Sequence, residues 1–148
     1  MEIPDSKEQI KVWSRARQSQ LPVTEGLQAM AAAAMTAAAM YGSLAKQLQG
    51  TQRELALQLR EQQIAVVRCL NGIYRMASGE TMQISCGAAE LQTMEAALRK
   101  LYGQSLRALH AFETRSADGE YGAVFEALAM RERESLRKNA ELMGLLQV

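Results

Sequence analysis

The chain of 148 residues is 48% hydrophobic, and its 17 Lys and Arg residues against 16 Asp and Glu residues give a formal charge of +1. This length suits one domain with a single core, and the balanced charge excludes the basic field that typically binds nucleic acid. Abundant Ala, Leu, Gln and Met, with 2 prolines and few aromatic residues, favour helix over sheet. The composition therefore predicts an all-α protein without a nucleic-acid partner.

The first residues predict a short amphipathic helix at residues 5–19, with Ile10 and Trp13 on one side. They lack the apolar stretch of a signal peptide. We therefore assign residues 1–20 to an N-terminal helix and linker, and residues 21–148 to one domain.

Four longer helices follow, each with apolar residues at a three-to-four spacing. They are expected at residues 24–48, 52–76, 91–114 and 121–146. Thr24 and Thr51 are candidate N-caps, and Gly50 is expected to close the first of these helices.

The links between the predicted helices have unequal lengths. Tight links join the first helix to the second and the third to the fourth, whereas about 14 residues separate the second from the third. Fully extended, such a link spans about 45 Å, which exceeds the roughly 37 Å of a 25-residue helix. We therefore predict a four-helix bundle of two antiparallel hairpins joined by a long crossover.

Residues 26–45 are nearly uncharged and about as long as a membrane span. They consist mainly of Ala and Met, which supply little insertion energy. A buried helix that allows close helix approach explains them better, so no membrane partner is expected. Met30, Met35 and Met40 are spread around this helix and are expected to fill the core rather than bind copper.

The two cysteines, Cys69 and Cys86, are too few for a disulfide framework. They indicate reduced thiols of a cytoplasmic protein. The single histidine, His110, is expected at the surface or at a helix interface, because it lies about 140° around the helix from Ser105.

A repeat relates the two predicted hairpins. The segment ALQLRE at 56–61 matches ALAMRE at 127–132, so Glu132 follows Glu61 by 71 residues. The same offset pairs Ile64 with Ser135, Tyr41 with Phe112 and Ala34 with Ser105. These matches indicate a duplicated helical hairpin.

With this repeat, residues 25–148 resemble the ferritin-like superfamily, and within it the rubrerythrin-type proteins. The segments REQQIAVVRCLNGIYRMASGE and EYGAVFEALAMRERESLRKNAELMGLL look like the second and fourth helices of that family. In the family, the first helix of each hairpin supplies a Glu with a Tyr seven residues later, and the second supplies Glu-x-x-His. The six ligands hold two iron atoms in the bundle core.

The resemblance places six positions of this chain at the family's metal ligands, and only two keep the ligand residue type. Those two are Glu61 and Glu132, while Tyr41 keeps one tyrosine and Phe112 replaces the other. The other four ligand positions hold Ala34, Ile64, Ser105 and Ser135. Two carboxylates are too few donors for a di-iron centre.

Glu61 and Glu132 would lie close together in the family's fold. Two like charges in a core do not both stay ionised cheaply. We expect these carboxyls to share a proton or to bond Tyr41, Ser105 and Ser135. The alternative is a slight rotation that carries both to the rim.

The sequence thus predicts a metal-free, catalytically degenerate ferritin-like protein without a cofactor or a catalytic residue. A structural or protein-interaction role follows, with a homodimer formed through helix faces. One alternative is a residual oxidoreductase or iron-handling protein that resembles rubrerythrin, with Glu61 and Glu132 as weak ligands to iron or manganese. A second alternative is a small-ligand pocket lined by Ala34, Ile64, Ser105 and Ser135.

Overall fold

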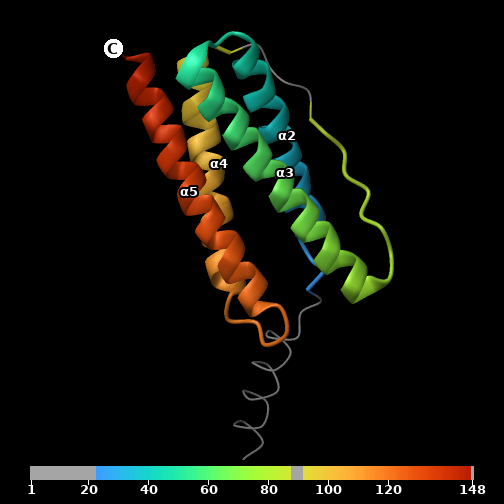
Figure 1. The fold of residues 1–148 in the computed structure, drawn as a ribbon. Helices are drawn as coiled ribbons and strands as arrows, with labels where there is room; N and C mark the ends of the chain where they lie inside the picture. The colour runs from blue at the N-terminus through green and yellow to red at the C-terminus, as the bar shows by residue number, and fades with distance from the viewer. Residues whose placement is uncertain (1–22, 88–91, 148) are drawn as a thin grey trace, which may run out of the picture.

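The computed structural model describes residues 23–87 and 92–147, which form four helices and no strand (Figure 1). The helices are α2 (Leu27–Lys46), α3 (Gly50–Ser78), α4 (Met94–Arg115) and α5 (Gly122–Leu146). The predicted all-α bundle of four long helices is confirmed. The N-terminal helix predicted at residues 5–19 lies outside the described residues.

Glycines in the left-handed region set the start of α2 and of α3. Gly26 has φ 79° and precedes α2, whose first N–H, on Leu27, donates to the Thr24 carbonyl at 3.3 Å. Gly50 has φ 61° and begins α3 instead of closing the preceding helix. The N-caps predicted at Thr24 and Thr51 are therefore wrong, because the N-cap residues are Gly26 and Gln49 and neither makes a side-chain capping hydrogen bond.

The start of α4 follows the usual capping pattern. The Thr93 hydroxyl accepts a hydrogen bond from the Ala96 N–H at 3.2 Å. This cap satisfies one of the N–H groups that lack a partner in the first turn. It places the start of α4 three residues later than the predicted residue 91.

The helices form two antiparallel hairpins, α2 with α3 and α4 with α5 (Figure 1). The hairpins meet where α3 packs on α5 and α2 packs on α4. Helices α3 and α4 run in the same direction, so the chain returns along the bundle between Ser78 and Met94 (Figure 1). This is the arrangement that the long predicted link allows.

The described part of the crossover, residues 79–87, is fixed to the α2–α3 hairpin. The Met82 N–H donates to Asn71 Oδ1 at 3.3 Å, and the Met82 side chain is buried. The Gly87 N–H donates to Thr36 Oγ1 at 3.1 Å. Anchors on both α3 and α2 hold the crossover against the bundle.

The core consists of two apolar clusters stacked along the bundle. One contains Phe112 and Phe125, whose ring centroids lie 6.4 Å apart, and the other contains Tyr41 and Leu98. Buried polar side chains separate the two clusters. This polar layer consists of Gln63 in α3, Ser105 in α4, and Glu132, Ser135 and Asn139 in α5.

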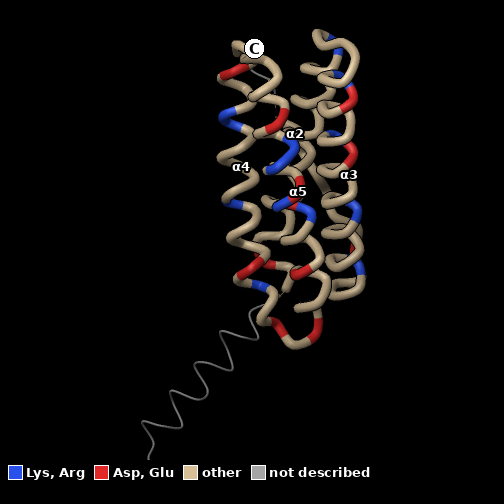
Figure 2. The backbone as a smooth tube through the Cα atoms, turned by 60° about the vertical axis from the view of Figure 1, so that its left-hand side comes forward, with Lys and Arg blue, Asp and Glu red and all other residues tan. Residues whose placement is uncertain are grey.

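The Ala- and Met-rich helix α2 belongs to this core. Met40 is buried, and Met30 and Met35 pack half-buried against the core, as the sequence predicted. Within residues 23–87 and 92–147, none of the helices has the length and hydrophobicity needed to cross a membrane. Figure 2 shows charged residues of both signs along α3, α4 and α5, whereas the only charged residue of α2 is Lys46.

Candidate functional site

The polar layer centres on the carboxyl group of Glu132, whose side chain is 1% exposed. Gln63 Nε2 donates a hydrogen bond to Glu132 Oε1 at 3.3 Å. Glu132 Oε2 has no hydrogen-bond partner among the described residues. The α3 residue that faces Glu132 is therefore Gln63, an amide, and not a second carboxylate.

Glu61 lies outside the core, contrary to the sequence-based expectation. Its side chain is 64% exposed, and its Oε1 lies 3.9 Å from Arg60 Nη1. The buried stripe of α3 runs through Leu59 and Gln63, four residues apart. Glu61 follows Leu59 by two residues, which turns it about 200° around the helix. Because Glu61 is exposed and Glu132 is buried, the two carboxyls do not share a proton. The alternative, in which both lie at the rim, is also wrong.

The register of α3 against α5 differs from the predicted register by two residues. Gln63 contacts Glu132, and Gln62 Oε1 accepts a hydrogen bond from the Ser135 hydroxyl at 2.5 Å. Gln63 and Val66 thus take the inward positions expected for Glu61 and Ile64. Ile64 is only half-buried, whereas Val66 is 1% exposed.

Helices α2 and α4 each add a buried residue to the site. Ala34 and Ser105, both buried, lie with Gln63, Val66 and Glu132 around one small cavity. The cavity has a volume of about 30 Å³, enough for one or two water molecules. A larger ligand fits only if side chains move apart.

Two acceptor oxygens without a hydrogen-bond partner border this cavity. They are Glu132 Oε2 and Gln104 Oε1. A buried acceptor without a donor costs about 1–3 kcal/mol. The cavity therefore favours a group that donates hydrogen bonds, such as water or a proton on Glu132 itself.

Burial raises the pKa of the Glu132 carboxyl above its ordinary value, and the polar groups of Ser105 and Gln63 beside it oppose this shift. Burial is the largest contribution, so the carboxyl keeps its proton to a higher pH than an exposed glutamate does. The protonated form supplies a donor to the cavity. The surroundings of Glu132 thus favour the neutral, protonated form of its side chain.

Asn139 joins the polar layer to Tyr41. Its Nδ2 donates to the Tyr41 hydroxyl at 2.8 Å and to the Leu98 carbonyl at 3.2 Å. Burial raises the pKa of the Tyr41 phenol, the Asn139 hydrogen bond lowers it in part, and the nearby Glu132 charge raises it. Tyr41 stays protonated and acts as a hydrogen-bonded core residue. Asn139 was not among the sequence-predicted site residues.

Phe112 and Tyr41, which the repeat treats as equivalent, lie in different surroundings. Phe112 is 1% exposed, borders the small cavity and belongs to the cluster of Phe125. Tyr41 belongs to the other cluster. The equivalence in sequence is not an equivalence in packing.

The six side chains at the candidate metal positions do not fit a di-iron centre. They are Ala34, Gln63, Val66, Ser105, Glu132 and Ser135. Two are hydrocarbons, two are neutral hydroxyls and one is an amide, which leaves a single carboxylate, whereas a di-iron site uses several carboxylates and imidazoles. In the described ranges, no three His, Cys, Asp or Glu side chains lie close enough to hold a metal ion.

The remaining reactive residues lie away from the polar layer. His110 is exposed, in agreement with its predicted surface position. Cys69 is half-buried in α3 and Cys86 is exposed in the crossover, and both are free thiols. Burial raises the pKa of the Cys69 thiol, which makes it a weaker nucleophile at neutral pH.

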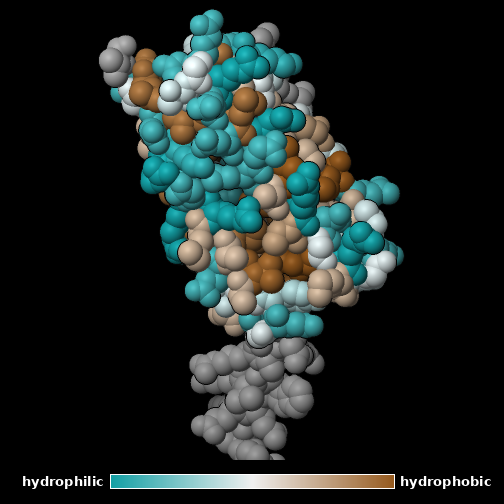
Figure 3. All heavy atoms as spheres, viewed as in Figure 1, coloured by the Kyte–Doolittle hydropathy of each residue, from teal (hydrophilic) through white to brown (hydrophobic). Residues whose placement is uncertain are grey.

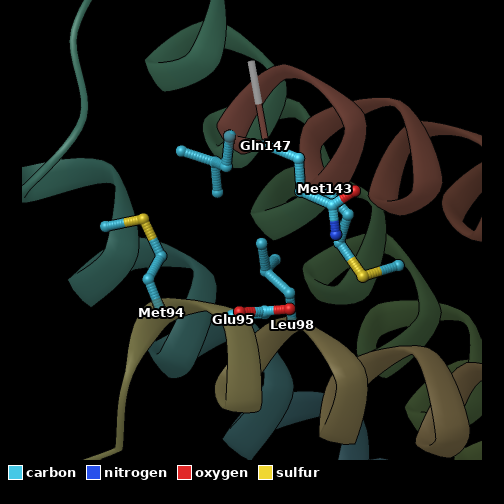
Figure 4. Close-up of a pocket in the computed structure, with 6 residues that line it drawn as sticks. Met94, Glu95, Leu98, Met143 and Gln147 are labelled. Carbon is cyan, nitrogen blue, oxygen red and sulfur yellow. The ribbon is translucent and has the colours of Figure 1, made fainter.

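A second cavity lies at the end of the bundle where α4 begins and α5 ends (Figure 4). Its volume is about 240 Å³. Met94 and Leu98 of α4 and Met143 of α5 give it a largely apolar lining. Nothing in its lining beyond Glu95 and Gln147 is polar, so it offers few groups that could orient a ligand.

Fold and site together define a four-helix bundle with one long crossover and a polar layer around a buried glutamate. Comparison of the chain with protein-family models, with curated proteins and with solved structures finds no match. The ferritin-like resemblance therefore depends on the residues and the topology of this chain.

Proposed function

We propose that the chain is a ferritin-like protein that has lost di-metal chemistry and acts as a structural or interaction protein. Two hairpins joined by one long crossover are the topology of that superfamily. The position of Glu132, buried between the hairpins at the midpoint of the core, corresponds to the position of a family ligand. This correspondence supports the proposed ancestry without assigning an activity.

The main support for the proposed loss of metal chemistry is the contact between Gln63 and Glu132. The residue that faces Glu132 is Gln63, which donates a hydrogen bond to the carboxyl at 3.3 Å. An amide donor satisfies the carboxyl in place of a cation, and it supplies no negative charge. The alternative function, an oxidoreductase or iron-handling protein, would use Glu61 and Glu132 as weak metal ligands. It is less well supported, because the Glu61 side chain is exposed and lies outside the core.

Metal analysis tests this proposal directly. We expect the full chain, incubated with ferrous iron or manganese and then desalted, to retain much less than one ion per chain by elemental analysis. Retention of about two ions per chain would contradict the proposal, because the native residues would then form the site.

Restoring the ligands tests the register as well. A variant with Ala34→Glu, Gln63→Glu, Val66→His, Ser105→Glu and Ser135→His is expected to bind two metal ions. The matched control combines Ala34→Glu, Ile64→His, Ser105→Glu and Ser135→His, keeps Glu61, and is expected not to bind them. Circular dichroism identifies any variant that does not fold, and metal retention by the control alone would contradict the Gln63 register.

The partner that we propose is a second copy of the chain. Figure 3 shows a hydrophobic patch on an otherwise mostly hydrophilic face, near the end of α3 and the start of α5. In these segments Met76 is 77% exposed, and Cys69 and Val124 are half-buried. Apolar surface of this kind is typical of contacts between subunits.

Light scattering after size exclusion measures the oligomeric state. We expect a mass of twice the 16.3 kDa of one chain and a shift to the monomer in Met76→Lys. The matched control is Leu106→Lys, at a 46% exposed apolar residue of α4, which is expected to stay dimeric. A wild-type monomer at about 0.1 mM, well above the micromolar range of ordinary interfaces, would contradict this interface.

A further inference from the structure

A basic groove lies between the second half of α2 and the first half of α3. Its volume is about 390 Å³, within the range of small-molecule sites. Three cations line it, Lys46 from α2 and Arg53 and Arg60 from α3. The whole chain has a formal charge of only +1, so this groove concentrates positive charge.

The cations of the groove have little compensation by acidic side chains. Arg60 Nη1 lies 3.9 Å from Glu61 Oε1, at the limit of an ion pair. Neither Lys46 nor Arg53 has a carboxylate within 4.0 Å in the part of the chain that the structure describes. Glu54, next to Arg53 in sequence, is exposed and makes no such pair.

The surface of α4 and α5 shows a different arrangement. Arg99 pairs with Glu95 at 2.7 Å, and Arg133 pairs with Glu113 at 3.0 Å. Arg137 lies between two glutamates of its own helix. These three arginines are matched by carboxylates, whereas Lys46 and Arg53 of the groove are available to an external anion.

Small residues on α2 create the hollow. Gly42 and Ser43 line it, and α2 has no acidic residue. A Cβ on Gly42 would lie 3.4 Å from Arg60 Cδ and 3.5 Å from its Nε. The Arg60 side chain therefore packs against α2 at Gly42, the one residue of that helix without a side chain. Leu57, 36% exposed, adds an apolar wall.

We propose that this groove binds a small soluble phosphate compound with at least two negative charges. Guanidinium groups bind phosphate oxygens in pairs, and a lysine adds a point charge. Arg53 and Arg60 lie seven residues apart, about 10 Å along the helix, so their side chains can contact both ends of a diphosphate. The Ser43 hydroxyl offers a further donor, and Leu57 favours a ligand with an apolar part.

Calorimetry with the full chain and pyrophosphate, at about 0.15 M salt to screen diffuse charge, tests the site. We expect saturable binding with one site per chain. Arg53→Gln and Arg60→Gln are each expected to weaken it at least tenfold. Gly42→Leu is expected to weaken it as well, because it fills the hollow and leaves every charge in place.

The matched control is Arg68→Gln, an exposed arginine of α3 outside the groove, which is expected to leave binding unchanged. The groove side chains that are changed lie at the surface, and circular dichroism verifies the fold of each variant. Equal weakening by Arg68→Gln, or no saturable binding of pyrophosphate, would overturn the proposal. Binding to phosphatidylglycerol vesicles without binding of pyrophosphate would also overturn it.

Discussion

Replacing Glu132 by glutamine is expected to raise the free energy of unfolding by about 2 kcal/mol at pH 8. Burial raises the pKa of this carboxyl, so the folded state binds the proton more tightly than the unfolded state. Below the ordinary value of 4.5, both states are protonated and no stability is lost. As the pH rises further, the unfolded state releases its proton first, and the stability of the native chain falls until the folded carboxyl also ionises.

The glutamine variant has no such proton to release. Its amide still accepts from Gln63, and its NH₂ group donates into the cavity that Gln104 Oε1 borders. The difference in stability from the native chain should therefore grow as the pH rises above the ordinary value of 4.5 and become constant once the folded carboxyl has ionised.

Urea denaturation at several pH values measures this difference. Glu61→Gln is the matched control, because Glu61 is exposed, and it should change stability by less than about 0.5 kcal/mol. A loss of stability in Glu132→Gln at pH 8 would contradict the interpretation. It would mean that the folded site stabilises an ionised carboxylate.

Replacing Asn139 by alanine is expected to lower the free energy of unfolding by about 3 kcal/mol. The substitution removes the donor to the Tyr41 hydroxyl and to the Leu98 carbonyl. Both acceptors belong to buried residues, and the missing side chain adds a small cavity. The Tyr41 hydroxyl loses its donor, the Leu98 carbonyl keeps only its bond within α4, and packing is lost, which makes this the largest loss that we predict.

A double-mutant cycle separates the hydrogen bond from the packing. Tyr41→Phe should cost about 1 kcal/mol in the native chain and close to nothing in the Asn139→Ala variant. Tyr102→Phe, at a half-buried tyrosine of α4, is the control and should be nearly neutral. Independent, additive effects of Tyr41→Phe and Asn139→Ala would contradict the hydrogen bond.

Most of the fold could be predicted because it depends on periodicity and link length. Apolar residues at three-to-four spacing determine which segments are helices, and the structure places all four helices within a few residues of prediction. The link after α3 is long enough to return along the bundle, which allowed α3 and α4 to be expected to run in the same direction. The starts of α2 and α3 were less predictable, since they follow from the positive φ of Gly26 and Gly50 and not from the capping side chains expected at Thr24 and Thr51.

The register of α3 in the site was predicted wrongly, although the sequence contains the signal for it. The similarity of ALQLRE and ALAMRE aligned Glu61 with Glu132. The apolar stripe of α3 instead includes Leu59 and Leu70, and three-to-four spacing from Leu59 reaches Gln63 and Val66. Burial decides which residues point inward, so the apolar period of the whole helix is a better guide than a short similar segment.

The hydrogen bonds of the site depend on three-dimensional contacts that no spacing reveals. Asn139 and Tyr41 are 98 residues apart in sequence. Their contact depends on how α5 crosses α2 and α4 at the level of Leu98. Ser135 was placed inward correctly, but its partner, Gln62, follows only from the corrected register.

The polar layer also has a consequence for assembly of the chain. Both clusters beside it are apolar, and hydrophobic attraction is non-directional, so it fixes the sliding position of one hairpin against the other only loosely. Such a slip would move Glu132 and Asn139 away from Gln63 and Tyr41 and leave their polar atoms in hydrocarbon. A buried polar group can specify alignment in this way even where it adds little stability. The buried polar side chains between the clusters thus give the bundle one unambiguous alignment.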